Sequence, residues 1–236
     1  MRLAHYDQLA ELFDFPGPDF AARGRTVLVS LEQEYPDAAA ELQKFLDGTP
    51  PHTLDLQELH TRTFDVQSLT TLDVGYVLFG DDYKRGALLS NLQREHMQAG
   101  NECRGELADH LPNLLRLISK ARDIDLLEEL VRHILIPALI MMIREFDPER
   151  VEKKNEIYRK YLKTVIDSAA AGEPTVYRLA LKALLNVLAR DFQARDLIDR
   201  EAASSPRPQA ADFLRRVHGE MDIEHKMDSI NSGCET

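Results

Sequence analysis

The spacing of apolar residues constrains this chain more than any other feature of its sequence. Apolar residues recur every three or four positions through most of the 236 residues, and strict alternation is almost nowhere sustained. A repeat near 3.6 residues is that of a helix with one buried face, whereas alternation is that of a half-buried strand. The pattern therefore predicts an all-α protein.

Helix-ending and helix-capping residues divide the apolar pattern into about nine predicted helices. Pro16 and Gly17 end the first helix, Pro36 begins the third and Gly48 ends it, and Thr53 is the predicted cap of the fourth. Proline fits the first turn of a helix because its missing N–H costs no bond there, and glycine fits the residue that ends one. Short helix-to-helix connections follow from these positions.

Three later segments carry less regular patterns. Residues 65–82 are rich in β-branched and polar side chains and contain two glycines, which predicts a structured connection. Asp109 is the predicted N-cap of the next helix, with Pro112 in its first turn. A strongly apolar helix should follow from Asp125 and be kinked at Pro137.

No internal repeat or low-complexity tract is present, which disfavours a helical solenoid. Residues 1–203 are predicted to form a single compact helical domain. Residues 204–236 read as a linker and a weakly amphipathic, partly mobile C-terminal tail.

The charge balance limits the classes of partner. Forty acidic and 29 basic residues give a formal net charge of −11, which repels nucleic acid and anionic membrane surfaces. We therefore expect no nucleic-acid partner. The same charge attracts a basic peptide, although an acidic surface that serves only solubility is the commoner explanation.

Cysteine content and hydropathy bear on the compartment. Cys103 and Cys234 are the only cysteines, too few for a disulfide framework in a chain of this length. No charged segment followed by an apolar core marks a secretory signal. The longest apolar run, residues 134–143, is far shorter than the ~20 residues that span a bilayer. These features predict a cytoplasmic protein without stable membrane insertion.

Motifs of the common enzyme classes are missing from the sequence, including the phosphate loop, the dinucleotide-binding glycines, the nucleophile elbow and the zincin motif. We therefore predict a protein that is not an enzyme, with no catalytic residues and no cofactor. One alternative would need His96, Cys103 and His110, spaced by seven residues, to hold a metal. Gly100 and Gly105 interrupt that helical spacing and no C-x-x-C pair supports it, so no metal site is predicted.

One segment has a more specific pattern. It is the run Glu106-Leu-Ala-Asp-His-Leu-Pro112, preceded by Tyr83-Lys-Arg-Gly86 and by a helix with Leu88, Leu92 and His96. This arrangement resembles the TorD/NarJ family of redox-enzyme maturation chaperones, and it is most similar to the NarJ-type members that assemble nitrate reductase. The resemblance covers residues 59–118, about a quarter of the chain.

The resemblance implies a single all-helical domain that acts as a system-specific assembly chaperone. Its client would be the catalytic subunit of a molybdopterin-dependent oxidoreductase, bound through an N-terminal twin-arginine signal or its remnant until the molybdenum cofactor is inserted. A nitrate reductase α-type subunit is the first expectation, and other dimethyl-sulfoxide-reductase-type enzymes remain open. By position, the implied peptide-binding residues are Glu106, Asp109, His110, Leu111, Pro112, Tyr83 and Arg85.

The residues themselves suit this role. Two carboxylates three positions apart at a helix start, Glu106 and Asp109, can accept arginine side chains bidentately, and neighbouring exposed leucines can take an apolar peptide helix. An accessible, negatively charged cleft beside residues 106–112 is therefore expected. The alternative role for Asp109 is helix capping alone, and the alternative function is that of a generic helical adaptor or regulatory protein for another partner. Whether the protein is a monomer or a dimer is left open.

Overall fold

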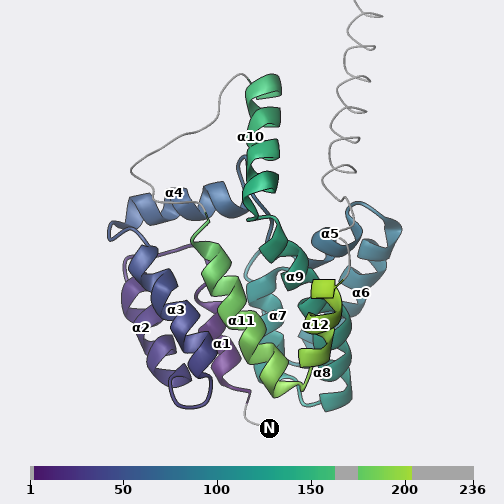
Figure 1. Ribbon diagram of the computed structural model, residues 1–236. Helices are drawn as coiled ribbons and strands as arrows, with labels where there is room; N and C mark the ends of the chain where they lie inside the picture. The colour runs from purple at the N-terminus through teal and green to yellow at the C-terminus, as the bar shows by residue number, and fades with distance from the viewer. Residues whose placement is uncertain (1–2, 163–174, 204–236) are drawn as a thin grey trace, which may run out of the picture. The chain divides into compact units, whose positions relative to one another are not determined.

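The computed structural model describes residues 3–162 and 175–203 (Figure 1). All regular secondary structure within these ranges is helical, and the β-type pairing found there is one isolated bridge between Asp73 and His110. The prediction of an all-α fold is confirmed.

The helices follow most of the predicted breaks in the first part of the chain, although the first helix ends at Ala10, before a turn that leads to Pro16. Their bounds are α1 (His5–Ala10), α2 (Phe20–Leu31), α3 (Pro36–Gly48), α4 (Thr53–Phe64), α5 (Val74–Phe79), α6 (Tyr83–Gln98) and α7 (Leu111–Lys120). Pro36 begins α3 as predicted, whereas Gly48 is the last helical residue and Thr49, not the glycine, is the residue that caps the end. Thr53 is the first residue of α4 rather than its cap, since His52 precedes the helix and no side chain caps it.

The remaining helices include one irregularity. Their bounds are α8 (Ile124–Leu130), η1 (Val131–Leu135), α9 (Ile136–Arg144), α10 (Pro148–Leu162), α11 (Tyr177–Asp191) and α12 (Arg195–Ala203). The predicted apolar helix from Asp125 thus consists of α8, the π-helical turn η1 and α9. Pro137 lies in the first turn of α9, directly after the π-helical turn. A proline ring collides with the carbonyl four residues earlier in a regular helix, so a wider turn at this place is the expected local response.

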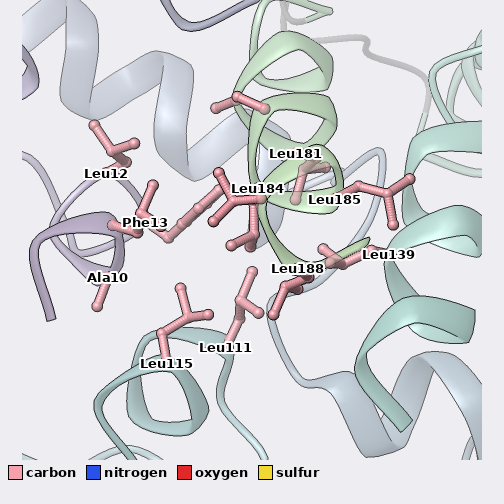
Figure 2. Packing of buried hydrophobic residues seen from close by; sticks show 14 of the residues in the cluster. Ala10, Leu12, Phe13, Leu111, Leu115, Leu139, Leu181, Leu184, Leu185 and Leu188 are labelled. Atoms are coloured by element: carbon pink, nitrogen blue, oxygen red, sulfur yellow. The ribbon is translucent and has the colours of Figure 1, made fainter. Parts of the chain in front are cut away.

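Helix α11 lies at the centre of the hydrophobic core. It packs against α3 on one side and α9 on the other, while α1 packs against α7. Figure 2 shows leucines of α11 directed toward α1, α7 and α9, among them Leu181, Leu184 and Leu188. Their spacing of three and four residues places them on one face of the helix, where all three are fully buried.

The contacts of the chain divide it into two units, Met1–Glu201 and Ala202–Thr236. The features described below belong to the first unit. The predicted C-terminal tail, residues 204–236, lies outside the described residues, as does Cys234. Among the described helices, none combines the length and apolar character needed to cross a membrane.

One wall of the first unit, formed by α5, α6 and the loop that leads into α7, carries the segment with the family-like pattern. Helix α5 packs against α6 and α9, and the loop after α6 leads into α7. Residues 65–82 were predicted as a connection without a helix; the six-residue α5 corrects this. Its sequence lacks a clear helical stripe, and the helix is completed by groups from distant residues, which are described next.

Candidate functional site

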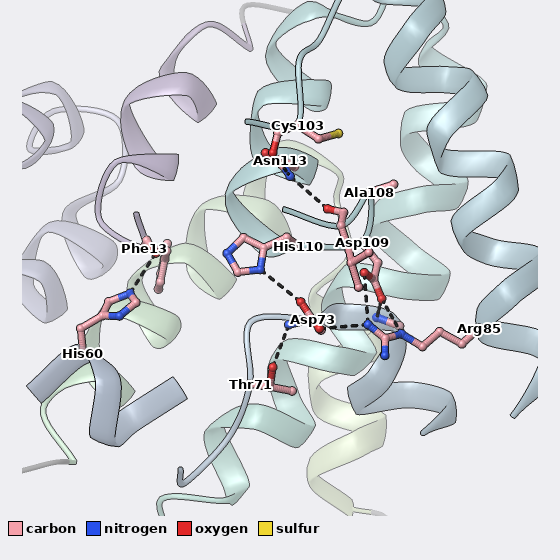
Figure 3. Close-up of polar contacts among 12 residues, drawn as sticks. Phe13, His60, Thr71, Asp73, Arg85, Cys103, Ala108, Asp109, His110 and Asn113 are labelled. Atoms are coloured by element: carbon pink, nitrogen blue, oxygen red, sulfur yellow. Dashed lines mark hydrogen bonds and ion pairs between the residues drawn. The ribbon is translucent and has the colours of Figure 1, made fainter. Parts of the chain in front are cut away.

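Asp109 is the centre of a polar network on this wall (Figure 3). Its side chain is fully buried. Its Oδ2 atom accepts hydrogen bonds from the Gly75 N–H at 3.1 Å and from Arg85 Nε at 3.0 Å, and its backbone oxygen accepts the Val74 N–H at 3.0 Å. Val74 and Gly75 are the first two residues of α5, whose N–H groups have no partner within the helix. Asp109 therefore caps α5 from 34 positions further along the chain.

The predicted role of Asp109 as the N-cap of its own helix is wrong. Helix α7 begins at Leu111, and His110 occupies the capping position without a side-chain bond. The backbone explains why: the Leu111 N–H donates to the Leu72 carbonyl, and Asp73 and His110 pair as an isolated bridge. His110 is therefore extended directly before α7, after a turn in which its N–H donates to the Leu107 carbonyl, and the Asp109 side chain serves α5 instead. Pro112 lies in the first turn of α7, as predicted.

Gly75 makes the close approach of the Asp109 carboxylate possible. A Cβ atom at this position would lie 2.6 Å from Asp109 Oδ2 and 3.1 Å from a methyl carbon of Leu88. The first distance is shorter than van der Waals contact allows. Any larger residue would have to displace the carboxylate from the helix end that it caps.

Arg85 joins Asp109 to a second carboxylate. Its Nη2 atom lies 2.9 Å from Asp73 Oδ2, and the other oxygen of Asp73 lies 3.2 Å from His110 Nδ1. Burial by itself would raise the pKa of Asp73, but the His110 and Arg85 partners outweigh it and leave that pKa below its usual value. The group is thus a four-residue polar network with Asp109 at its buried end and Asp73 partly exposed.

A second set of hydrogen bonds shapes the loop between α6 and α7. The side-chain nitrogen of Asn113 donates to the carbonyls of Cys103 and Leu107 at 3.1 and 3.0 Å. Asn113 is buried, and it lies in α7. One amide group therefore ties both ends of the 103–107 turn to the rigid helix that follows.

His96 fixes the same loop from α6. Its Nε2 atom lies 2.9 Å from the Ala108 carbonyl, and its Nδ1 atom lies 2.8 Å from the side-chain nitrogen of Asn101. A carbonyl only accepts, so Nε2 carries the proton and Nδ1 accepts. Burial lowers the pKa of the His96 imidazole below its usual value despite the bond to Ala108. The ring is therefore held neutral, in one tautomer, by two loop groups.

These contacts also bear on the metal alternative. Both ring nitrogens of His96 are used, and His110 Nδ1 bonds to Asp73. Burial raises the pKa of the Cys103 thiol, which disfavours the thiolate form that binds metals. Across residues 3–162 and 175–203, no three His, Cys, Asp or Glu residues are grouped closely enough to hold a metal ion.

The predicted peptide-binding residues fall into a buried and an exposed group. Asp109, Leu111 and Pro112 are buried, and Arg85 and His110 are partly buried within the network. In this conformation the buried carboxylate of Asp109 is already paired with Arg85 and is not open to an arginine of another chain. The expected accessible pair of Glu106 and Asp109 carboxylates is therefore not formed.

The exposed group consists of one residue at the start of α6 and two in the turn that precedes α7. Glu106 is exposed, its neighbour Leu107 is 48% exposed, and Tyr83 at the start of α6 is 81% exposed. The backbone of Glu106 and Leu107 is held by the turn that Asn113 closes. The turn closed by Asn113 thus presents one acidic and one apolar side chain at the surface.

Three residues of this site were missed from the sequence: Asp73, Gly75 and Asn113. The roles of Asp73 and Gly75 depend on pairing between segments some 35 positions apart, and Asn113 acts on carbonyls 6 and 10 residues before it in an irregular turn, neither of which local helical spacing reveals. The combination Asp73-Val-Gly75 ahead of a short apolar stretch is the one local signal for a helix start with a close backbone approach.

No protein-family model, curated protein or solved structure matches the chain.

Proposed function

We propose that this protein is a cytoplasmic assembly chaperone that binds the N-terminal segment of a molybdopterin-dependent oxidoreductase catalytic subunit and holds it until the molybdenum cofactor is inserted. The protein itself turns over no substrate in this account. A nitrate reductase α-type subunit is the first candidate client. The kind of client rests on the resemblance of residues 59–118, and the site below supports the binding role.

The observation that carries the proposal is that residues 106–112 include both buried residues that hold the helices together and exposed residues that can contact a partner. The buried member Asp109 connects α5, α6 and the start of α7, while Glu106 and Leu107 face outward from a turn closed by Asn113. A motif that served only to hold the helices together would need Asp109 but not the exposed Glu106 and Leu107. The exposed acidic and apolar pair, on a rigid support, suits a basic and apolar peptide segment.

The proposed contacts differ from those that the sequence first suggested. Glu106 offers its carboxylate to an arginine of the client peptide, and Leu107 and Tyr83 offer apolar surface. Asp109, Leu111 and Pro112 are positioning residues beneath them. The net charge of −11 favours the approach of a cationic peptide, and this attraction weakens with added salt.

Titration calorimetry tests the proposal with the N-terminal peptides of molybdoenzyme catalytic subunits encoded beside this protein. We expect saturable one-to-one binding that weakens as salt increases. A matched peptide with its arginines replaced by glutamine should bind about tenfold or more weakly. Equal binding of both peptides, or no binding of any client peptide, would contradict the proposal.

A further inference from the structure

The outward face of α6 is composed unlike an ordinary solvated helix face. Tyr83 and Met97, near its two ends, are 81% and 75% exposed, among the most exposed large apolar side chains of the described chain. They are 14 residues apart, and the exposed residues between them on the same face are Gly86, Ala87, Ser90 and Arg94. The opposite face, with Leu92 and His96, packs inward. The outward face thus has small residues near its centre, Arg94 beyond them, and a large apolar side chain near each end.

Among the described residues, no packing contact explains a glycine at position 86. Gly86 lies within α6 in a helical conformation, and a Cβ atom there would meet no atom of residues 3–162 or 175–203 within 4 Å. A glycine in a helix costs roughly 0.5–1 kcal/mol relative to alanine because of its backbone freedom. Gly75, by contrast, is needed by the approach of Asp109. The missing side chain at Gly86 therefore leaves room for another backbone to approach the helix from outside.

We infer that this face binds the same face of a second copy of the chain, as an antiparallel pair of α6 helices related by a two-fold axis at Ser90. The inference does not rest on the proposed function; the two share Tyr83, so a bound client peptide and a second copy would compete for that side chain. With Ser90 on the axis, Tyr83 of each chain lies opposite Met97 of the other, and an aromatic ring beside a thioether is a favourable contact. Gly86, Ala87 and Ser90 allow the two helices to come close together.

Charge also favours a second copy and the antiparallel direction. The exposed Asp82, which caps α6, lies at the Tyr83 end, whereas the exposed Arg94 lies toward the Met97 end. A two-fold axis brings Asp82 of each chain beside the part of the other helix that carries Arg94, which also pairs with Glu95 of its own chain, and within reach of the long arginine side chain. A parallel pair would place like charges and like side chains together. The face is therefore complementary to itself in both shape and charge.

The size of the face sets the strength of the association. A helix of 16 residues is about 24 Å long, and one helix pair buries less than the roughly 800 Å² per partner of a standard stable interface. The dimer is accordingly weak and depends on protein concentration.

Sedimentation equilibrium of the full chain over a wide concentration range is the first test. The average mass should rise with concentration from one chain of 26.9 kDa toward two. Ser90→Lys places two like charges at the axis and should weaken association by about tenfold or more. Gln33→Lys, at an exposed position of a region outside α6, adds the same charge and should leave it unchanged. A wild-type mass that stays at one chain throughout, or a dimer equally sensitive to both changes, overturns the inference.

Cross-linking tests the register independently of affinity. In a background with Cys103→Ser and Cys234→Ser, Ser90→Cys should form a covalent dimer on oxidation with copper phenanthroline in air. Lys84→Cys, also exposed on α6, should not, since the two copies of residue 84 would lie about 18 Å apart along the axis. Equal cross-linking at both positions contradicts the antiparallel pair. If the wild-type protein stays a single chain and Ser90→Lys loses client-peptide binding, the face binds a peptide rather than a second copy. This result also overturns the inference.

Discussion

The carboxylate of Asp109 lies 3.1 Å from the backbone nitrogen of Gly75, and this contact joins two segments that are 34 residues apart in sequence. It caps a six-residue helix that has no capping side chain of its own. Because the same oxygen also accepts from Arg85, one buried group aligns α5, α6 and the start of α7. The stability of this wall and the placement of its exposed residues therefore depend on the same contact.

Removal of the Asp109 carboxylate should be costly. Asp109→Ala leaves Arg85 with one carboxylate partner and the first turn of α5 without its side-chain acceptor, and we expect a loss of about 3 kcal/mol in the free energy of unfolding. Urea unfolding followed by circular dichroism at pH 7 measures it. Glu106→Ala, in the same motif but exposed, should change stability by less than about 0.5 kcal/mol. Similar losses in both variants would contradict the assignment of buried and exposed roles.

Two glycines should respond oppositely to alanine. Gly75→Ala places a methyl group 2.6 Å from Asp109 Oδ2 and should destabilise by about 1–3 kcal/mol. Gly86→Ala meets open space on a helix and should stabilise the monomer by up to about 1 kcal/mol. A double-mutant cycle of Gly75→Ala with Asp109→Ala should show coupling, because the clash disappears with the carboxylate. Strictly additive losses would mean that the close contact carries no energy.

His96 should give a pH dependence of defined sign. Burial lowers its pKa in the folded state below the value near 6.5 of an unfolded chain, so the unfolded state binds the proton more readily. The stability from neutral His96 is then complete above about pH 6.5 and is lost as the pH falls toward the folded pKa. An NMR titration of the imidazole should place its midpoint below that of the free residue. His96→Gln should have a flatter stability profile between pH 7.5 and 5.5; an unchanged profile would rule out His96 as its source.

Asn113 should control the order of the turn that carries Glu106 and Leu107. Asn113→Ala removes the shared donor of the Cys103 and Leu107 carbonyls and should cost about 1–3 kcal/mol. Amide hydrogen exchange in residues 103–108 should become faster. Asn113→Asp keeps the shape but points an acceptor at two carbonyl oxygens, so it should be at least as harmful. Unchanged exchange in both variants would show that the turn is held by other groups.

The sequence predicted the helices better than it predicted the site, for physical reasons. The first-turn prolines Pro36 and Pro112 act within one turn of helix, and both lie where local spacing places them. Helix α5 depends on an acceptor from 34 residues away, so its local sequence resembles a connection. The same long-range pairing explains why Asp109 was taken for the cap of its own helix. Burial of the Asp109 side chain likewise follows from its contacts with Gly75 and Arg85, which are far away in the sequence.

Comparison of peptide affinities among exposed and stability-neutral variants tests the central claim most directly. Tyr83→Ala, Glu106→Ala and Leu107→Ala remove exposed groups and should leave the unfolding transition nearly unchanged. Calorimetric titration of the triple variant with the client peptide that the wild type binds should show an affinity about tenfold or more lower. An affinity equal to that of the wild type, in a variant shown to be folded, would place peptide binding elsewhere and contradict the account.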